Sequence, residues 1–139
     1  MKIIAKYILC ASILFSCNSQ KLTILSNDSE SIEFEEVQLN KILLDPSIYN
    51  EKYISSKGYA SFGFEMSAVF LDKESRSKYN SNNSIWLIPA RTLTITQCDS
   101  IEKYFNNKKV RIKGKFDSKS KGHLGYYMGS LILYSIEEL

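Results

Sequence analysis

The chain has 139 residues, of which 44% are hydrophobic and 24% are charged. This length gives room for one domain with a single hydrophobic core, and the composition is that of a globular protein rather than a disordered one. Lys2 and Lys6 lie in a leader that we expect to be removed, which lowers the formal net charge from +3 to +1. A nearly neutral domain lacks the overall positive field that attracts nucleic acid.

The N-terminus has the three-part plan of a secretory signal peptide. Lys2 and Lys6 form a short basic start, residues 7–15 are an apolar run, and Ser16 is a small residue at its end. The apolar run is too short for a transmembrane helix, which needs roughly 20 residues. We therefore predict that residues 1–16 are a signal peptide.

The last residues of this segment, Leu14-Phe15-Ser16-Cys17, resemble the lipobox of bacterial lipoproteins. The resemblance implies cleavage between Ser16 and Cys17, acylation of Cys17, and a mature protein tethered to the bacterial cell envelope. Asn18 is similar to the residue found in lipoproteins that are sent to the outer membrane. Two alternatives stay open: Cys17 is an ordinary residue beside an ordinary cleavage site, or the whole segment is a buried helix or strand.

The remaining chain divides into a tether and a domain. Residues 17–31 contain the cysteine followed by many Ser, Asn, Asp and Glu residues, which favours a flexible tether, and residues 32–139 form the expected domain. Cys10 leaves with the leader and Cys17 carries lipid, so Cys98 has no disulfide partner. We expect Cys98 to be a small buried apolar residue.

The domain has a mainly β pattern with one or two short helices. Apolar residues at helical spacing predict a helix over residues 39–44, and residues 99–105 predict a second, capped by Asp99 or Ser100. Residues 66–71 are almost all apolar and should form a central strand. The predicted strands cover residues 53–62, 65–72, 85–89, 110–117 and 125–136.

Residues 109–116 alternate strictly between basic and core-forming residues, with glycine among the latter. This alternation predicts a strand with one buried face and one outward face. The outward face carries Lys109, Arg111, Lys113 and Lys115, which we call the cationic face. A turn over residues 119–122 should join this strand to the last one as a hairpin.

Residues 49–58 align without gaps with residues 105–114. Each segment has a helix end, an Asn that stops the helix, a strand and then Gly58 or Gly114, which we expect to mark a bulge or sharp bend. Three strands, a helix and two more strands, with glycine in the first and fourth, resemble the OB-fold, a small five-stranded barrel. The same features are similar to small bacterial envelope lipoproteins with OB-type domains, largely uncharacterised, and imply a fold and a location.

No catalytic constellation is evident in the sequence. His123 is the only histidine, and one histidine without a His or Cys neighbour does not make a usual zinc site. The adjacent acids Glu35 and Glu36 should project to different faces and so do not form an acid/base pair. We expect no cofactor and no enzymatic activity.

The leading hypothesis is therefore a non-enzymatic envelope lipoprotein that binds a protein partner or an anionic envelope component through the cationic face. The alternative is a barrel that binds a small ligand or oligosaccharide through Trp86 and neighbouring aromatic residues, although Trp86 is also a candidate core residue. Several aromatic residues could stack on the bases of a nucleic acid, namely Tyr59, Phe62, Phe64, Tyr79, Tyr126 and Tyr127. Because the mature domain is nearly neutral and is expected outside the cytoplasm, nucleic acid is not an expected partner.

Overall fold

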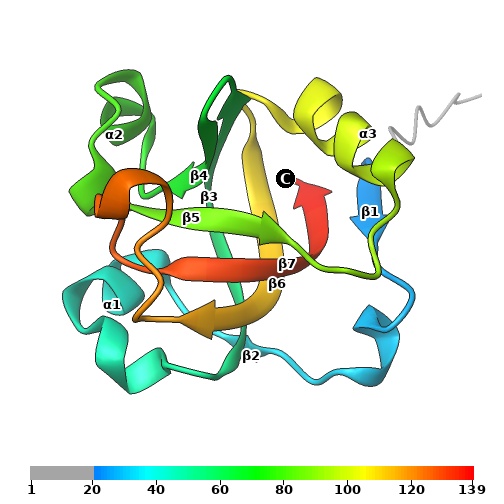
Figure 1. The fold of residues 1–139 in the computed structure, drawn as a ribbon, viewed down its shortest axis with the longest axis horizontal. Helices are drawn as coiled ribbons and strands as arrows, with labels where there is room; N and C mark the ends of the chain where they lie inside the picture. The colour runs from blue at the N-terminus through cyan, green and yellow to red at the C-terminus, as the bar shows by residue number, and fades with distance from the viewer. Residues whose placement is uncertain (1–20) are drawn as a thin grey trace, which may run out of the picture.

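The computed structural model describes residues 21–139, so the predicted signal peptide, its cleavage site after Ser16 and the lipid attachment site at Cys17 lie outside the described residues. The described chain is mainly β, with a seven-stranded mixed sheet and three short α-helices (Figure 1). The strands are β1 (Thr23–Leu25), β2 (Glu35–Glu36), β3 (Tyr53–Gly63), β4 (Met66–Phe70), β5 (Ser84–Pro89), β6 (Lys109–Asp117) and β7 (Ser130–Glu138). The helices are α1 (Leu39–Leu44), α2 (Lys73–Ser77) and α3 (Ile95–Phe105).

The five longer strands pair in a path that returns to its first member. β3 pairs antiparallel with β4 and with β6, β4 pairs antiparallel with β5, β5 pairs parallel with β7, and β7 pairs antiparallel with β6. The short β1 adds to β7 and the short β2 adds to β3. The inward side chains of these strands are fully buried and form the core, as at Ile54, Val69, Ile85, Ile112 and Leu131.

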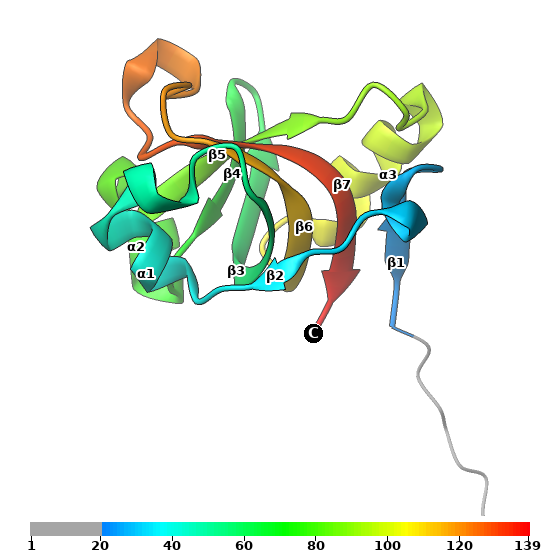
Figure 2. The same cartoon turned by 90° about the horizontal axis from the view of Figure 1, so that it is seen from below.

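Two groups of elements lie at opposite ends of the sheet. In both views α1 and α2 lie at one end, while α3 and β1 lie at the other (Figures 1 and 2). The loop between β6 and β7 is at the same end as α1 and α2. The described chain therefore begins, at β1, on the side away from that loop.

Most predicted elements are confirmed. The helix over residues 39–44 is α1, and the strands predicted at 53–62, 65–72, 85–89 and 110–117 are β3 to β6 with ends within two residues. β4 lies between β3 and β5, as expected for a central strand. The last strand was predicted too early, because Gly122, Leu124 and Gly125 adopt positive φ values of 65°, 55° and 75° that break an extended chain.

The predicted start of α3 was wrong. Instead of Asp99 or Ser100, Thr94 caps the helix, and α3 begins at Ile95. The Thr94 Oγ accepts a hydrogen bond from the Gln97 backbone N–H at 3.1 Å, and the Gln97 Oε1 accepts one from the Thr94 N–H at 2.8 Å. This reciprocal capping box satisfies two backbone donors that a helix start leaves open.

The expected tether also extends too far into the chain. Residues 17–31 were assigned to it, but Thr23–Leu25 pairs antiparallel with β7, and the Ser26 N–H donates to the Tyr134 carbonyl at 2.8 Å. Ser26 and Ser29 are buried. The folded part therefore begins by Thr23, because this β-prone triplet completes an edge that β7 leaves open.

The two aligned segments form the same turn. Asn50 has φ −56° and ψ 133°, and Asn106 has φ −59° and ψ 132°. The residue after each one, Glu51 or Asn107, has φ 64°. Each helix therefore ends at its asparagine, as expected, and the left-handed conformation is taken by the residue that follows.

Each asparagine also makes an equivalent long-range hydrogen bond. Asn106 precedes β6, and its Oδ1 accepts a hydrogen bond from the Phe62 N–H at the end of β3 at 2.9 Å. Asn50 precedes β3, and its Oδ1 accepts a hydrogen bond from the Ser118 N–H after β6, also at 2.9 Å. The repeat in the sequence is therefore a repeat in structure, in which each turn fastens the end of the other strand.

The two glycines of the repeat act differently. At Gly114 the pairing of β6 with β7 shifts register, which confirms a bulge, and an added Cβ would lie 2.2 Å from the Ile132 carbonyl oxygen. At Gly58 the register of β3 is regular, but an added Cβ would lie 2.4 Å from the Val69 Cγ1. Gly58 therefore permits close approach of two strands rather than a bulge.

Candidate functional site

The cationic face lies where the alternation predicted it. Val110, Ile112 and Phe116 are fully buried, whereas the basic side chains of β6 lie on the outer face of the sheet. Lys109 is exposed, and Arg111, Lys113 and Lys115 are half-buried. The question for function is how much of this positive charge is free to meet a ligand.

Acidic residues from other parts of the chain neutralise two of the four cations. The Arg111 Nη1 lies 3.0 Å from the Glu137 Oε2 on β7, and its Nε lies 3.9 Å from the Glu36 Oε2 on β2. The Lys115 Nζ lies 2.6 Å from the Glu51 Oε2, and this hydrogen bond and charge raise the pKa of Lys115. The net charge presented along β6 is therefore much lower than the sequence suggests.

Aromatic rings cover another part of the cationic face. The Lys113 Nζ lies 6.0 Å from the centre of the Phe34 ring, and the Lys115 Nζ lies 6.0 Å from the centre of the Tyr53 ring. Phe34, Tyr53 and Tyr134 contact one another with ring centres 6.1 to 6.3 Å apart. Within residues 21–139, Lys109 alone of the four has neither an acidic nor an aromatic partner. These contacts join the segment before β2 to the sheet.

A second surface forms where the β6–β7 loop crosses the outer side of β4 and β5. Trp86 on β5 stacks on the His123 ring with centres 6.1 Å apart, and the Tyr127 ring lies 5.0 Å away. An added Cβ on Gly122 would lie 2.6 Å from the Trp86 side chain, so glycine is needed for the loop to pack this closely. Trp86 is half-buried in this small cluster rather than in the main core.

The β3–β4 hairpin joins the same surface. The His123 Nε2 lies 3.6 Å from the Glu65 Oε2, and the Tyr127 hydroxyl donates to the Met66 Sδ at 3.5 Å. Glu65, at the hairpin tip, has φ 54°. These contacts hold the hairpin and the β6–β7 loop beside each other.

Large apolar side chains project from both loops. Phe64 is 93% exposed, Leu124 70% and Tyr126 64%. We call these three residues the apolar loop face. Leu124 has a φ of 55°, in the left-handed region that residues other than glycine seldom adopt. Exposed apolar side chains that form a contiguous patch are typical of an interaction surface.

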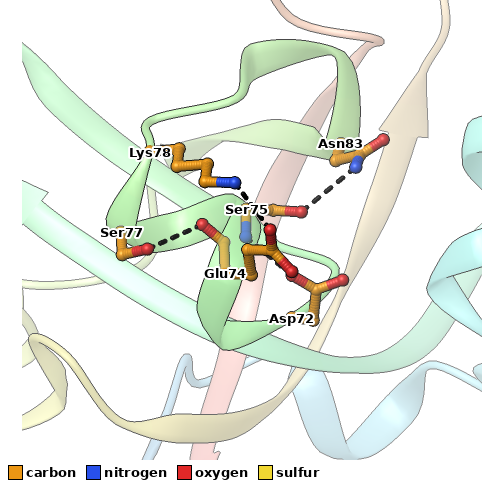
Figure 3. Close-up of polar contacts among 6 residues, drawn as sticks. All are labelled: Asp72, Glu74, Ser75, Ser77, Lys78 and Asn83. Carbon is orange, nitrogen blue, oxygen red and sulfur yellow. Dashed lines mark hydrogen bonds and ion pairs between the residues drawn. The ribbon is translucent and has the colours of Figure 1, made fainter.

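A polar cluster around α2 has its groups satisfied internally (Figure 3). The Asp72 carboxylate caps the helix by accepting from the Ser75 N–H at 2.7 Å, which lowers the pKa of Asp72. The Asn83 amide donates to the Ser75 hydroxyl at 3.1 Å, and Lys78 pairs with Glu74 at 2.6 Å. The cluster fastens α2, which packs against β3 and β4, and we assign it a structural role.

In residues 21–139 no three His, Cys, Asp or Glu side chains are grouped so that they could hold a metal ion. Cys98 is half-buried, and burial, with the Asp99 and Glu102 carboxylates, raises the pKa of its thiol. Within the same range, no helix is long and apolar enough to span a bilayer.

Comparison with protein families, curated proteins and solved structures found no match for this chain. The sequence indicates Phe64, Tyr126 and Tyr127 as candidates for aromatic stacking, but it does not predict that the loops that carry them lie beside each other. The pair of glycines around His123 and Leu124 is the signal that could have located the loop.

Proposed function

We propose that the chain is a lipid-anchored protein of the bacterial cell envelope, held by Cys17, that binds a protein partner without catalysing a reaction. The likeness of residues 14–17 to a lipobox supports the anchor, and Asn18 favours the outer membrane as its location. We further propose that the domain is an OB-type barrel. The pairing path that returns to β3, with α3 between β5 and β6, supports this assignment.

The observation that carries the binding proposal is the apolar loop face. Its three side chains are exposed by 64% or more and lie on two loops joined by the His123–Glu65 contact. Aromatic side chains such as those of Tyr126 and Phe64 are enriched at the cores of protein interfaces, where a partner excludes water from them. A protein with a complementary apolar pocket is the partner that fits this surface.

The cationic face supports a partner less well. An anionic envelope component would have to compete with Glu137 and Glu51, which already lie 3.0 Å and 2.6 Å from Arg111 and Lys115. Lys109 remains available, but one exposed lysine gives a weak and salt-sensitive attraction. We therefore place the anionic ligand second to a protein bound at the loops.

An oligosaccharide ligand is the alternative that Trp86 favours, because a half-buried tryptophan beside Tyr127 and His123 could stack on a sugar ring. The His123 ring already covers Trp86, so the loop would have to open first. Titration with envelope glycans while recording the fluorescence of Trp86, the only tryptophan, tests this. A saturable spectral shift would favour a sugar over a protein partner.

Site-specific photo-cross-linking in intact cells of the source bacterium tests the protein partner. A photoreactive phenylalanine analogue replaces Tyr126 or Phe64 in the full chain, and the same analogue at Leu44, 88% exposed on α1, is the matched control. We expect one adduct of the same mass from both loop positions and none from Leu44. Equal labelling from all three positions, or none from the loops, would contradict the proposal.

A further inference from the structure

An uncharged groove lies between β1 and α3. It has a volume of about 370 Å³, and Leu22, Leu25 and Tyr104 on its walls are 38%, 41% and 46% exposed. None of its lining residues is acidic or basic, although 24% of the chain is charged. The lining residues are Leu22, Thr23, Ile24, Leu25, Thr96, Gln97, Ser100 and Tyr104.

The groove is a fixed part of the fold. The Gln97 side-chain amide donates to the Leu25 carbonyl at 2.9 Å, so the residue that completes the α3 capping box also holds β1 beside the helix. Asp99, Glu102 and Lys103 line a separate hollow with Phe62 and Gly63. Helix α3 therefore has one uncharged flank toward β1 and a charged flank toward the β3–β4 hairpin.

The position of the groove relative to Cys17 indicates what it contacts. Four residues lie between Cys17 and Leu22, and the five steps along an extended chain span at most about 18 Å. A lipid on Cys17 would therefore keep Leu22, on the wall of this groove, within about 18 Å of the bilayer surface. Leucine and tyrosine side chains are suited to the boundary between headgroups and acyl chains.

We propose that the domain rests on the lipid surface through this groove, with Leu22, Leu25 and Tyr104 in the interface. The inference rests on the lipid anchor proposed above. Lys21 precedes Leu22, and the Lys103 Nζ lies 5.0 Å from the centre of the Tyr104 ring, so basic groups border the apolar contact and can meet anionic headgroups.

In this orientation one end of the molecule contacts lipid and the other end is free to contact a protein. β1 and α3 lie at one end and the β6–β7 loop lies at the other in both views (Figures 1 and 2). With the groove on the membrane, the β6–β7 loop with Leu124 and Tyr126 points away from the lipid, toward a partner, while Phe64 lies on the hairpin that packs beside α3 (Figures 1 and 2).

Paramagnetic relaxation in a nanodisc tests the orientation. The full chain, produced with its native leader and purified from membranes, is placed in nanodiscs of phosphatidylethanolamine and phosphatidylglycerol that carry a gadolinium-chelating lipid. We expect strong relaxation enhancement of the amides of Leu22, Leu25 and Tyr104, and little at Leu124 and Tyr126. Uniform enhancement along the domain, or the strongest enhancement at the loop, would overturn the proposal.

A double variant, Leu25→Glu with Tyr104→Glu, should lose the selective enhancement while remaining attached to the nanodisc. The matched control is Leu44→Glu with Ile48→Glu, two exposed apolar residues near α1, which should keep it. The mass of Cys17 separates the two proposals. An unlipidated chain would contradict both the proposed anchor and this inference. A triacylated chain with uniform relaxation enhancement would contradict the proposed orientation alone.

Discussion

Two buried serines on the strands have opposite environments. The Ser56 hydroxyl is fully buried without a hydrogen-bond partner, whereas the Ser130 hydroxyl donates to the Ser120 carbonyl at 3.0 Å and accepts from the Ser120 hydroxyl at 2.9 Å. Removing an unsatisfied buried hydroxyl relieves a desolvation cost, and removing a satisfied one loses a bond.

We therefore predict that Ser56→Ala raises the free energy of unfolding by about 1 kcal/mol and that Ser130→Ala lowers it by about 1 kcal/mol. Urea denaturation of the two variants beside the parent chain measures both changes. Equal destabilisation by the two substitutions would show that Ser56 has a partner in solution.

Cys98 should be a slow nucleophile. Burial raises the pKa of its thiol, and the Asp99 and Glu102 carboxylates add to the shift. Since the thiolate is the reactive form, alkylation at neutral pH should be slower in the folded chain than in urea and should speed up as the pH rises toward the raised pKa. Iodoacetamide labelling of Cys98, followed by peptide mass spectrometry, measures this. Equal rates in the two states would contradict the raised pKa.

At the scale of one helix, the capping box at Thr94 and Gln97 should contribute measurably to stability. Thr94→Ala removes the side-chain acceptor for the Gln97 N–H and should lower the free energy of unfolding by about 1 kcal/mol. Thr94→Ser keeps the acceptor and serves as the control. Denaturation of both variants compares them, and equal losses would mean that the threonine methyl group matters rather than the cap.

At the scale of the sheet, the cationic face should act mainly within the fold. Arg111→Glu would place three carboxylates together, with Glu137 and Glu36, and should lower the free energy of unfolding by about 1 kcal/mol or more. Lys109→Glu, which disturbs no such pair, should change it little. Thermal unfolding of both variants decides the matter, and a larger loss from Lys109→Glu would contradict this assignment.

The elements that could be predicted are those whose signals are local. Alternation along β6 and the apolar run of β4 identified both strands. A strand with one buried face alternates between apolar and polar residues, and a strand buried on both faces is a continuous apolar run. The start of α3 was missed because Thr94 and Gln97 lie outside the apolar pattern that was followed. The turn over residues 119–122 was expected, but residues 125–129 of the β6–β7 loop were assigned to the last strand, because the positive φ values of the loop leave only Gly122 and Gly125 as a signal in the sequence.

At the scale of the whole molecule, the candidate sites depended on contacts that no local pattern contains. The basic residues of β6 were visible, but Glu51 and Glu137, which neutralise Lys115 and Arg111, come from distant parts of the chain. The apolar loop face likewise needs Phe64 from one loop and Tyr126 from another. The sequence could locate the outward face of a strand but could not tell that its charges were already paired.

The two ends of the molecule differ: the proposed anchor and the uncharged groove lie at the end with β1, and the exposed Leu124 and Tyr126 lie at the other (Figures 1 and 2). Each end by itself would be an ordinary surface. Together with the lipid proposed on Cys17, they correspond to the binding module that we propose, presented away from the membrane.

The most direct test of this account is intact-mass spectrometry of the full-length gene product purified from bacterial membranes. We predict a mature chain that begins at Cys17 and carries a diacylglyceryl group with an additional amide-linked acyl chain. A chain that keeps Met1, or one that begins at another residue without lipid, would contradict the anchor and the orientation that depends on it.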